Sequence, residues 1–401
     1  MIKNYPKPYA VIIGLDSIQG LQAARILADR KVPVIGIAGN TKMYTCSTRV
    51  CEQILQVDTS SEKLTDLLVD LGPDLTQKAA LFPCQEKNVL VVSRDRDRLA
   101  PWYHVILPDH EIVTRLVDKV SFYTYAQKEG FAIPKTCFLA SRAEAENAAK
   151  SLIYPVTLKP TYRSNEWVNH THHKAFKINS ADELLAIYDQ HHRFASLMVV
   201  QEWIEGTDSN LYSCYCYYDS NHQPAVTFTA KKIRQWPPHI GQSSLGVECQ
   251  NEFILHETLN LFGSMNYRGL AALEIKRDER DGRYLIVEPN IGRPTGRSAI
   301  AEAGGVELHY TMYCDALGWP LPENREQKYT GAKWIHILRD LQSSAYYYKK
   351  GELNLKEWRQ SIQGRKVDAI FSRRDPLPFL NALKASIPVL LSGSRRGDVE
   401  G

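Results

Sequence analysis

The sequence predicts an α/β protein in which a Rossmann-like N-terminal domain is followed by two lobes that each carry a sheet. Residues 9–13 and 32–37 are apolar runs separated by a helical stretch, the order of a parallel strand–helix–strand unit. Residues 211–218 and 225–232 alternate as antiparallel strands do. Residues 273–293 predict a further hairpin, closed by a tight turn that contains an Asp-Gly pair.

Two glycines, Gly14 and Gly20, stand where the first strand turns into a helix. The pattern approaches G-x-G-x-x-G but lacks the middle glycine and the spacing. We therefore favour a structural domain whose helix N-terminus faces a ligand over a dinucleotide site. Further strands are expected at 81–83 and 103–107, and the domain should end near residue 115.

A smaller set of helices and strands is expected between residues 118 and 204. The expected elements are a helix at 119–130, a strand beyond Pro134, a helix at 141–152, a strand at 154–160, a strand at 174–178, a helix at 181–190 and a strand at 198–204. Residues 161–173 show no apolar period. We expect a polar loop there, which acts as a mobile lid and contains Trp167.

Chain length and composition set the limits of the interpretation. A chain of 401 residues holds two or three domains. We divide it into 1–115, a two-lobed domain at 116–320 (lobes 116–200 and 201–320), a helix-rich segment at 321–391, and a disordered tail at 392–401. The aromatic run Tyr346-Tyr347-Tyr348 in the helix-rich segment is a candidate interface between copies of the chain.

Charge and cysteine usage exclude several classes of protein. The net charge of +4 is small and there is no long basic run, so nucleic acid is not expected as a partner. No apolar stretch is long enough to span a bilayer, and the N-terminus has no signal-peptide pattern. Eight cysteines without a Cys-x-x-Cys pair predict buried thiols in a reducing compartment, and hence a cytoplasmic protein.

The predicted hairpin at 273–293 carries acidic residues inside apolar strands. Glu274 stands on the first strand, while Glu288 and Asn290 stand two residues apart on the second and so share a face. Two carboxylates and an amide oxygen suit Mg²⁺, which prefers hard oxygen ligands. The alternative is a surface hairpin with ordinary strand charges, but a carboxylate among apolar neighbours is costly unless it is paired or metal-bound.

The order of polar residues along the chain resembles that of the ATP-grasp superfamily. The series is Lys119, Lys159, residues 201–208, Lys232 with Arg234, and then Glu274, Glu288 and Asn290. Four segments carry the resemblance: Asp118-Lys119 before residues 130–136, Lys231 to Pro238, Glu274 to Gly282, and Phe371 to Phe379. The similarity covers about residues 9–390 and is greatest to carboxylate–amine ligases of the D-aspartate ligase type.

The resemblance implies an ATP-grasp fold that binds ATP and one or two Mg²⁺ ions between two lobes. Lys119 and Lys159 would contact the phosphates, Gln201, Glu202, Trp203 and Ile204 would form the hinge that contacts adenine, and Asp208 would bind the ribose. Mg²⁺ would be bound by Glu274, Glu288 and Asn290. The γ-phosphate and the acyl phosphate would be bound by Lys232 and Arg234. The substrate carboxylate would be bound by Arg293 or Arg297.

Two departures from the family pattern concern this site. The loop after Lys159 is usually glycine-rich, whereas residues 161–173 contain no glycine. Either Arg163 and histidines replace the backbone N–H groups there, or the phosphates are bound more weakly. The usual Asn-x-Arg is one residue longer here, Asn290-Ile-Gly-Arg293, which leaves open whether Arg293, Arg297 or both bind the carboxylate.

The function implied is an ATP-dependent, ADP-forming ligase that couples a small-molecule carboxylate to an amine, with an amino acid as one substrate. One alternative is an ATP-grasp carboxylase, although no biotin-carrier-like Met-Lys-Met is present. A second is a nucleotide-binding protein with decayed chemistry, and a Rossmann oxidoreductase is less favoured still. A zinc site at His170, His172 and His173 with His191-His192 is also less favoured than a polar lid.

Overall fold

A computed structural model describes residues 3–392 apart from residues 163, 172, 174, 239 and 240. The chain forms two compact units. The larger consists of Met1–Thr114, Thr207–Leu273 and Pro289–Gly401, and the smaller of Arg115–Gly206 and Glu274–Glu288. The expected tail lies almost wholly outside the described residues, and the domain boundaries expected from the sequence stay a prediction.

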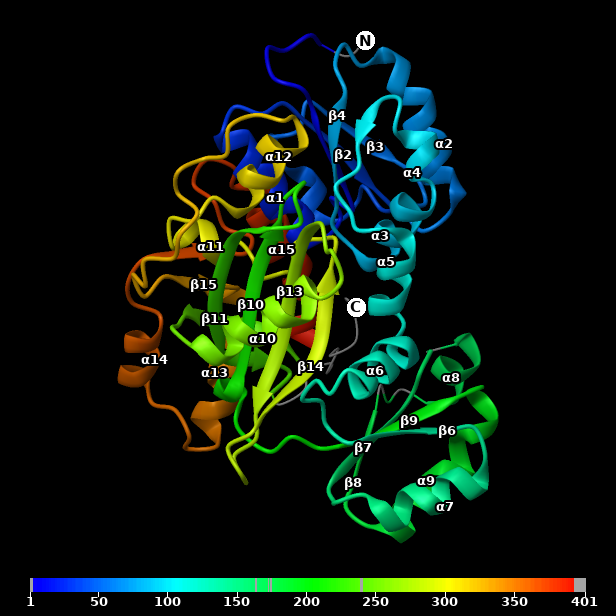
Figure 1. Ribbon diagram of the computed structural model, residues 1–401. Helices are drawn as coiled ribbons and strands as arrows, with labels where there is room; N and C mark the ends of the chain where they lie inside the picture. Colours follow the sequence, from blue (N-terminus) through cyan, green and yellow to red (C-terminus); the bar gives the residue numbers. More distant parts are fainter. Residues whose placement is uncertain (1–2, 163, 172, 174, 239–240, 393–401) are drawn as a thin grey trace. The chain divides into compact units, whose positions relative to one another are not determined.

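The N-terminal part of the larger unit is a five-stranded parallel sheet in the order β3-β2-β1-β4-β5 (Figure 1). Its strands are β1 (Ala10–Ile13), β2 (Val34–Ala38), β3 (Gln53–Gln56), β4 (Ala79–Pro83) and β5 (Tyr103–His104). Its helices are α1 (Ile18–Asp29), α2 (Glu62–Leu71), α3 (Glu86–Arg94), α4 (Arg96–Leu99) and α5 (His110–Val117). The expected Rossmann-like arrangement is confirmed, with a change in strand order between β1 and β4.

The two glycines of the first turn are explained by close packing. Gly14 has a φ of +90°, and its carbonyl oxygen accepts a hydrogen bond from the Ser17 hydroxyl. Ser17 caps α1 by accepting from the Gly20 N–H at 3.2 Å. A Cβ on Gly20 would lie 2.3 Å from the Gly14 carbonyl oxygen, so no larger residue fits.

A second, seven-stranded sheet has the order β14-β13-β10-β11-β12-β15-β16. Its strands are β10 (Leu211–Tyr218), β11 (Pro224–Trp236), β12 (Gln242–Glu248), β13 (Gly269–Arg277), β14 (Tyr284–Ile291), β15 (Lys333–Ile335) and β16 (Lys366–Asp368). The accompanying helices are α10 (Glu252–Gly263), α11 (Ile300–Ala303), α12 (Leu308–Ala316), α13 (Ile337–Lys349), α14 (Leu355–Ser361) and α15 (Leu377–Ser392). One apolar core, containing Ile12, Phe228 and Trp334, joins this sheet to the N-terminal sheet within the larger unit.

The expected hairpin is confirmed at β13 and β14. Gly282 adopts a φ of +78° in the turn, and its N–H donates to the Asp278 carbonyl oxygen at 2.9 Å. The Asp278 side chain is fully buried and pairs with Arg280 at 2.7 Å. The outer part of the hairpin, Glu274–Glu288, groups with the smaller unit.

The smaller unit is built on a four-stranded sheet in the order β6-β9-β7-β8. Its strands are β6 (Thr136–Leu139), β7 (Val156–Pro160), β8 (Phe176–Ile178) and β9 (Met198–Glu202). Its helices are α6 (Lys119–Lys128), α7 (Arg142–Ser151), α8 (Asn165–His170) and α9 (Ala181–His191). Helices α7 and α9 lie side by side along the sheet (Figure 1), and their apolar faces complete its core.

Residues 161–173 differ from expectation, because they contain the short helix α8 instead of a polar loop alone. Ser164 caps this helix by accepting from the Trp167 N–H at 3.1 Å. The Trp167 side chain is fully buried, and its Nε1–H donates to the His173 carbonyl oxygen at 3.0 Å. One large aromatic side chain attaches the segment to the core without any apolar period, so the periodicity criterion failed here. Arg163 and His172 lie outside the described residues.

Candidate functional site

The smaller unit brings two of the expected phosphate-binding lysines together. Lys119 is the first residue of α6, which Asp118 caps by accepting from the Ser121 N–H at 2.8 Å. Lys159 lies on β7 and is partly buried. Burial and the nearby charge of Lys119 lower the pKa of Lys159, while Glu288 opposes this shift.

Neither ammonium group has a hydrogen bond or an ion pair with any described residue. Lys159 therefore carries a desolvated positive charge beside a second cation, which is unfavourable unless an anion binds there. Two adjacent lysines of this kind are suited to a phosphate group.

The acidic residues expected to bind metal occupy neighbouring strands. Glu274 lies on β13 and is half-buried, whereas Glu288 lies on β14 and is exposed. The Tyr123 hydroxyl donates to the Val287 carbonyl oxygen at 2.9 Å, which links α6 to the same stretch of β14. Carboxylate oxygens on adjacent strands are of the ligand type that Mg²⁺ prefers, so these residues fit the metal that the family pattern implies.

The segment expected to contact adenine is held by the smaller unit itself. Gln201 is buried, and its side-chain amide donates to Thr136 Oγ1 at 2.9 Å. The Trp203 ring has the Lys177 ammonium 4.5 Å and the Lys276 ammonium 5.6 Å from its centroid.

Backbone groups of the same segment are also engaged. Lys276 donates to the Ile204 carbonyl oxygen at 2.6 Å, and Arg280 to the Trp203 carbonyl oxygen at 2.9 Å. The N–H groups of Glu202 and Trp203 donate to other backbone carbonyl oxygens. The adenine role of these residues stays a prediction.

The remaining expected site residues lie in the larger unit. Two arginines among them, Arg293 and Arg297, differ in burial and in hydrogen-bond partners. Arg297 is buried and donates to Ser213 Oγ at 2.5 Å, Tyr215 OH at 2.8 Å and Ser243 Oγ at 2.7 Å. These hydroxyl groups orient its guanidinium without neutralising the charge.

Arg293 is only partly buried and donates to Asn290 Oδ1 at 2.7 Å. The expected metal ligand Asn290 therefore already accepts a hydrogen bond from a cation. Its role at the metal stays a prediction.

Arg234 and Asp208 have structural partners that the sequence did not indicate. Arg234 is buried and makes two hydrogen bonds of 2.9 Å with the fully buried carboxylate of Asp340. Asp208 accepts from the Gln235 side-chain amide and from the Tyr347 hydroxyl, each at 2.8 Å. These contacts give both residues a structural function, and their expected roles at the phosphate and the ribose stay predictions.

Lys232 is also buried, and its ammonium donates to Gln235 Oε1 at 3.2 Å. The register between β11 and β12 shifts on both sides of Arg234. The simple alternation that would place Lys232 and Arg234 on one face is therefore interrupted.

The histidines of the expected lid pack with aromatic rings. His170 stacks on Phe194 with centroids 3.6 Å apart, and His191 stacks on Phe176 at 4.7 Å. Burial, His170 and His173 lower the pKa of His191. Within the described part of the chain, no cluster of three or more His, Cys, Asp or Glu residues could hold a metal ion. Likewise, no described helix is long and apolar enough to cross a bilayer.

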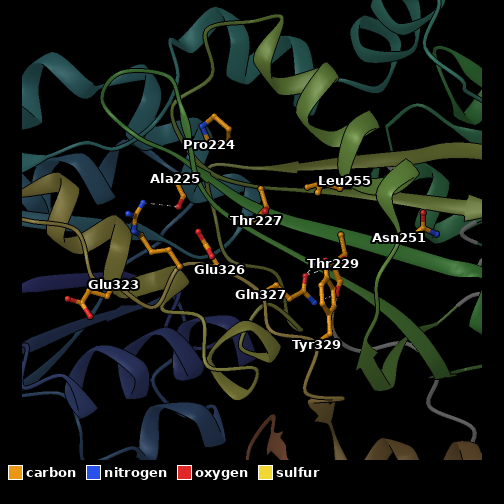
Figure 2. Close-up of a pocket in the computed structure, with 11 residues that line it drawn as sticks. Pro224, Ala225, Thr227, Thr229, Asn251, Leu255, Glu323, Glu326, Gln327 and Tyr329 are labelled. Atoms are coloured by element: carbon orange, nitrogen blue, oxygen red, sulfur yellow. Dashed lines mark hydrogen bonds between the residues drawn. The ribbon is translucent and has the colours of Figure 1, made fainter.

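A cavity of about 350 Å³ lies in the larger unit, and none of the expected site residues is among those that line it. Figure 2 shows Thr227 and Thr229 of β11 facing Gln327 and Tyr329 across it. Gln327 accepts from the Thr229 N–H at 2.8 Å and donates to its carbonyl oxygen at 2.9 Å. Gln327 and Thr229 thus satisfy each other, and Glu323, Arg325 and Glu326 add charged groups to the lining.

A known ligase resembles part of this chain in sequence. The chain matches no family model. It is 26% identical over 248 residues to D-aspartate ligase from Enterococcus faecium, a match that covers 59% of this chain and 58% of that protein. The chain thus spans less than two thirds of the length of this relative.

Solved structures extend the likeness over most of the chain. N5-carboxyaminoimidazole synthetase from Staphylococcus aureus, complexed with ADP, superimposes with a TM-score of 0.63 at 12% identity and 81% coverage of both chains. The biotin carboxylase domain of 2-oxoglutarate carboxylase from Hydrogenobacter thermophilus, with MgADP and bicarbonate, has a TM-score of 0.59 at 14% identity, covering 80% of this chain and 71% of that one. The chain therefore has the ATP-grasp fold, and the resemblance predicted from the sequence is confirmed.

Proposed function

We propose that this ATP-grasp protein is an ATP-dependent, ADP-forming ligase that activates a carboxylate as an acyl phosphate and couples it to an amine. The observation that carries the proposal is the pair Lys119 and Lys159 in the smaller unit, both without a described partner, with the charges of Lys119 and Glu288 both acting on Lys159. The match to D-aspartate ligase supports the reaction class and an amino acid as one substrate. Eight free cysteines support a reducing compartment such as the cytoplasm.

In this proposal Lys119 and Lys159 bind the phosphates of ATP and reduce the repulsion felt by an incoming carboxylate. Glu274 and Glu288 supply oxygen ligands for Mg²⁺, with Asn290 as a third candidate. When bound, the metal supplies positive charge that offsets the charge developing on the transferred phosphoryl group. Arg293 and Arg297 are the cations available to hold the substrate carboxylate.

The proposed chemistry has two steps and needs no side-chain nucleophile. A substrate carboxylate oxygen attacks the γ-phosphorus, an O–P bond forms, and ADP leaves. The amine then attacks the acyl carbon, phosphate leaves, and the nitrogen loses a proton. The protein's part is to position the reactants and to stabilise charge.

A carboxylase is the second candidate, because structures with this fold include a domain solved with bicarbonate. The two readings differ in what triggers ADP release from the purified protein. A ligase releases ADP when an amino acid pair is supplied and forms one amide per ADP. A carboxylase releases ADP on addition of bicarbonate instead.

The test is a screen of amino acids, singly and in pairs, for ADP release with Mg·ATP, repeated with bicarbonate alone. Glu288→Gln is the negative control, and Glu146→Gln on an exposed face of α7 is the matched neutral variant. Amine-dependent ADP release that disappears in Glu288→Gln supports the proposal. ADP release that needs bicarbonate and no amine contradicts it.

A further inference from the structure

Tyr123 is a buried tyrosine of the smaller unit, on the helix that carries one of the phosphate-binding lysines. It stands four residues after Lys119 on α6, so the two side chains project from one face of this helix. Only 4% of Tyr123 is exposed. A buried hydroxyl group needs hydrogen-bond partners, and those of Tyr123 lie on two strands that carry other expected site residues.

The first partner is the backbone beside a candidate metal ligand. The Tyr123 hydroxyl donates to the carbonyl oxygen of Val287 at 2.9 Å, and Val287 directly precedes Glu288 on β14. The Ile286 N–H donates to the Ala132 carbonyl oxygen at 2.7 Å. Helix α6 and the segment that follows it therefore hold the stretch of β14 that leads into Glu288.

The second partner lies on β9, where the segment expected to contact adenine begins. The Gln201 side chain forms a hydrogen bond with the Tyr123 hydroxyl, and this bond lowers the pKa of the phenol, so the Gln201 amide is its donor. The same amide also donates to Thr136 Oγ1 at 2.9 Å. One hydroxyl group thus accepts from β9 and donates to β14.

The hydroxyl group remains a donor at neutral pH. Burial raises the pKa of Tyr123 to about 12, with Glu288 acting in the same direction and Gln201 against it. The charges of Glu288 and Lys119 also act on Lys159. Tyr123, both lysines and Glu288 therefore form one group of interacting side chains within the smaller unit.

Groups that orient the ligands of a metal ion affect how tightly the metal binds, commonly by 10- to 100-fold. In phosphoryl transfer the cationic side chains and the metal act on the same phosphates, so their relative placement matters. The hydrogen bond from Tyr123 fixes α6, which carries Lys119, against the strand that carries Glu288.

We propose that Tyr123 is a positioning residue that couples nucleotide binding to Mg²⁺ binding, because it fixes Lys119 relative to Glu288. The inference rests on the proposed function in one respect: Lys119 is taken to bind phosphate and Glu288 to bind the metal. With the hydroxyl group in place, nucleotide and Mg²⁺ should each increase the affinity of the chain for the other.

The coupling is measured as a ratio of two dissociation constants of a non-hydrolysable ATP analogue, the value without Mg²⁺ divided by the value at saturating Mg²⁺. Calorimetry on the purified full-length chain gives both values without turnover. Tyr123→Phe removes only the hydroxyl group and should lower this ratio about tenfold relative to the wild-type chain. Binding without Mg²⁺ should change little, because Lys119 and Lys159 are retained.

Tyr154→Phe is the matched control in the same unit. The Tyr154 hydroxyl donates to the Ala149 carbonyl oxygen at 3.2 Å, so each variant loses one hydrogen bond from a tyrosine to the backbone. Both variants should lower the free energy of unfolding by similar amounts, but only Tyr123→Phe should change the ratio. If Tyr123→Phe weakens binding equally with and without Mg²⁺, or if both variants lower the ratio alike, the hydroxyl group of Tyr123 is merely structural and the inference is overturned.

Hydrogen exchange on the wild-type chain is a second measurement, and it needs no variant to fold. Addition of Mg²⁺ to the chain with bound analogue should slow amide exchange both in α6 and in the stretch of β14 around Glu288, because Tyr123 joins the two. Slower exchange around Glu288 alone would contradict the coupling.

The two proposals can fail separately. Analogue affinity that does not respond to Mg²⁺ in the wild-type chain would contradict the metal site and, with it, the role of Tyr123. A wild-type ratio in Tyr123→Phe would contradict only the role of Tyr123 and leave the ligase proposal standing. A lowered ratio in Tyr123→Phe, together with a wild-type chain that releases no ADP with any amine, would support the role of Tyr123 and contradict the proposed function.

Discussion

Replacement of Lys159 by methionine should change stability and nucleotide binding in opposite directions. Lys159 is partly buried, its ammonium has no described partner, and burial together with Lys119 lowers its pKa. Methionine keeps the length and the apolar stem but removes the unpaired charge. The variant without nucleotide should therefore be more stable than the wild-type chain, because the cost of a desolvated cation beside a second cation disappears.

Nucleotide affinity should fall in the same variant. A hydrogen bond to a charged group contributes roughly 1.5–3 kcal/mol, so loss of the Lys159–phosphate contact should weaken binding of a non-hydrolysable ATP analogue about 10- to 150-fold. Calorimetric titration measures this change, and chemical denaturation measures the stability. Lys150→Met, an exposed lysine on α7, is the matched control and should alter neither quantity.

The stability gain should also depend on pH. The folded pKa of Lys159 lies below its ordinary value of 10.5, so between the two values the unfolded chain binds more protons than the folded chain. The cost of burying the charge is therefore fully present below the folded pKa and is relieved as the pH rises towards 10.5. The difference between the variant and the wild-type chain should shrink over that range. A variant that is less stable at neutral pH and binds the analogue normally would refute the reasoning.

Three further predictions follow from single side chains. Glu288→Gln should abolish Mg²⁺-dependent turnover while stability changes by no more than about 0.5 kcal/mol, because Glu288 is exposed; a wild-type rate at saturating Mg²⁺ would rule out the metal assignment. Asp340→Asn should lower the free energy of unfolding, measured by urea denaturation, by about 3–5 kcal/mol, because it leaves the buried guanidinium of Arg234 without its counter-charge. Arg142→Gln, in an exposed ion pair, should lower it by about 1 kcal/mol or less. Trp167→Ala should cost about 3–5 kcal/mol and accelerate amide hydrogen exchange across α8, and unchanged exchange would show that Trp167 does not anchor the helix.

Local signals explain what the sequence could predict. The turn at Gly282 requires a positive φ, and the Asp281-Gly282 pair predicts such a turn from two residues alone. Helix α6 was predictable because Asp118 stands at its N-cap and Gly130, with a φ of +75°, follows its end. The order of the lysines and carboxylates along the chain then predicted the ATP-grasp fold, because in that fold each of these residues stands on a particular strand or helix.

Features without a local signal were not predicted. Helix α8 is stabilised by one buried tryptophan, which leaves no repeating pattern to detect. Strand β12 is rich in serine and glycine and was missed for that reason. Trp334 lies on β15, a short strand inside a segment that was expected to be helical. Asp340 is 106 residues away from Arg234, and no motif links them.

The environments of three arginines show why residue type alone could not assign their roles. Arg234, Arg293 and Arg297 are chemically identical, and the family pattern allowed each to bind an anion. A carboxylate neutralises Arg234 inside the protein, so an incoming anion would gain little from it. Hydroxyl groups contact the guanidinium of Arg297, and an amide oxygen contacts that of Arg293, and these neutral acceptors orient both side chains. Arg297 is buried and fixed at three points, whereas Arg293 is partly exposed and held at one. A rigid cation suits the charge that develops in a transition state, and an adjustable one suits capture of the substrate. We therefore expect Arg297→Lys to lower kcat and Arg293→Lys to raise KM, and the reverse pattern would assign the two roles the other way.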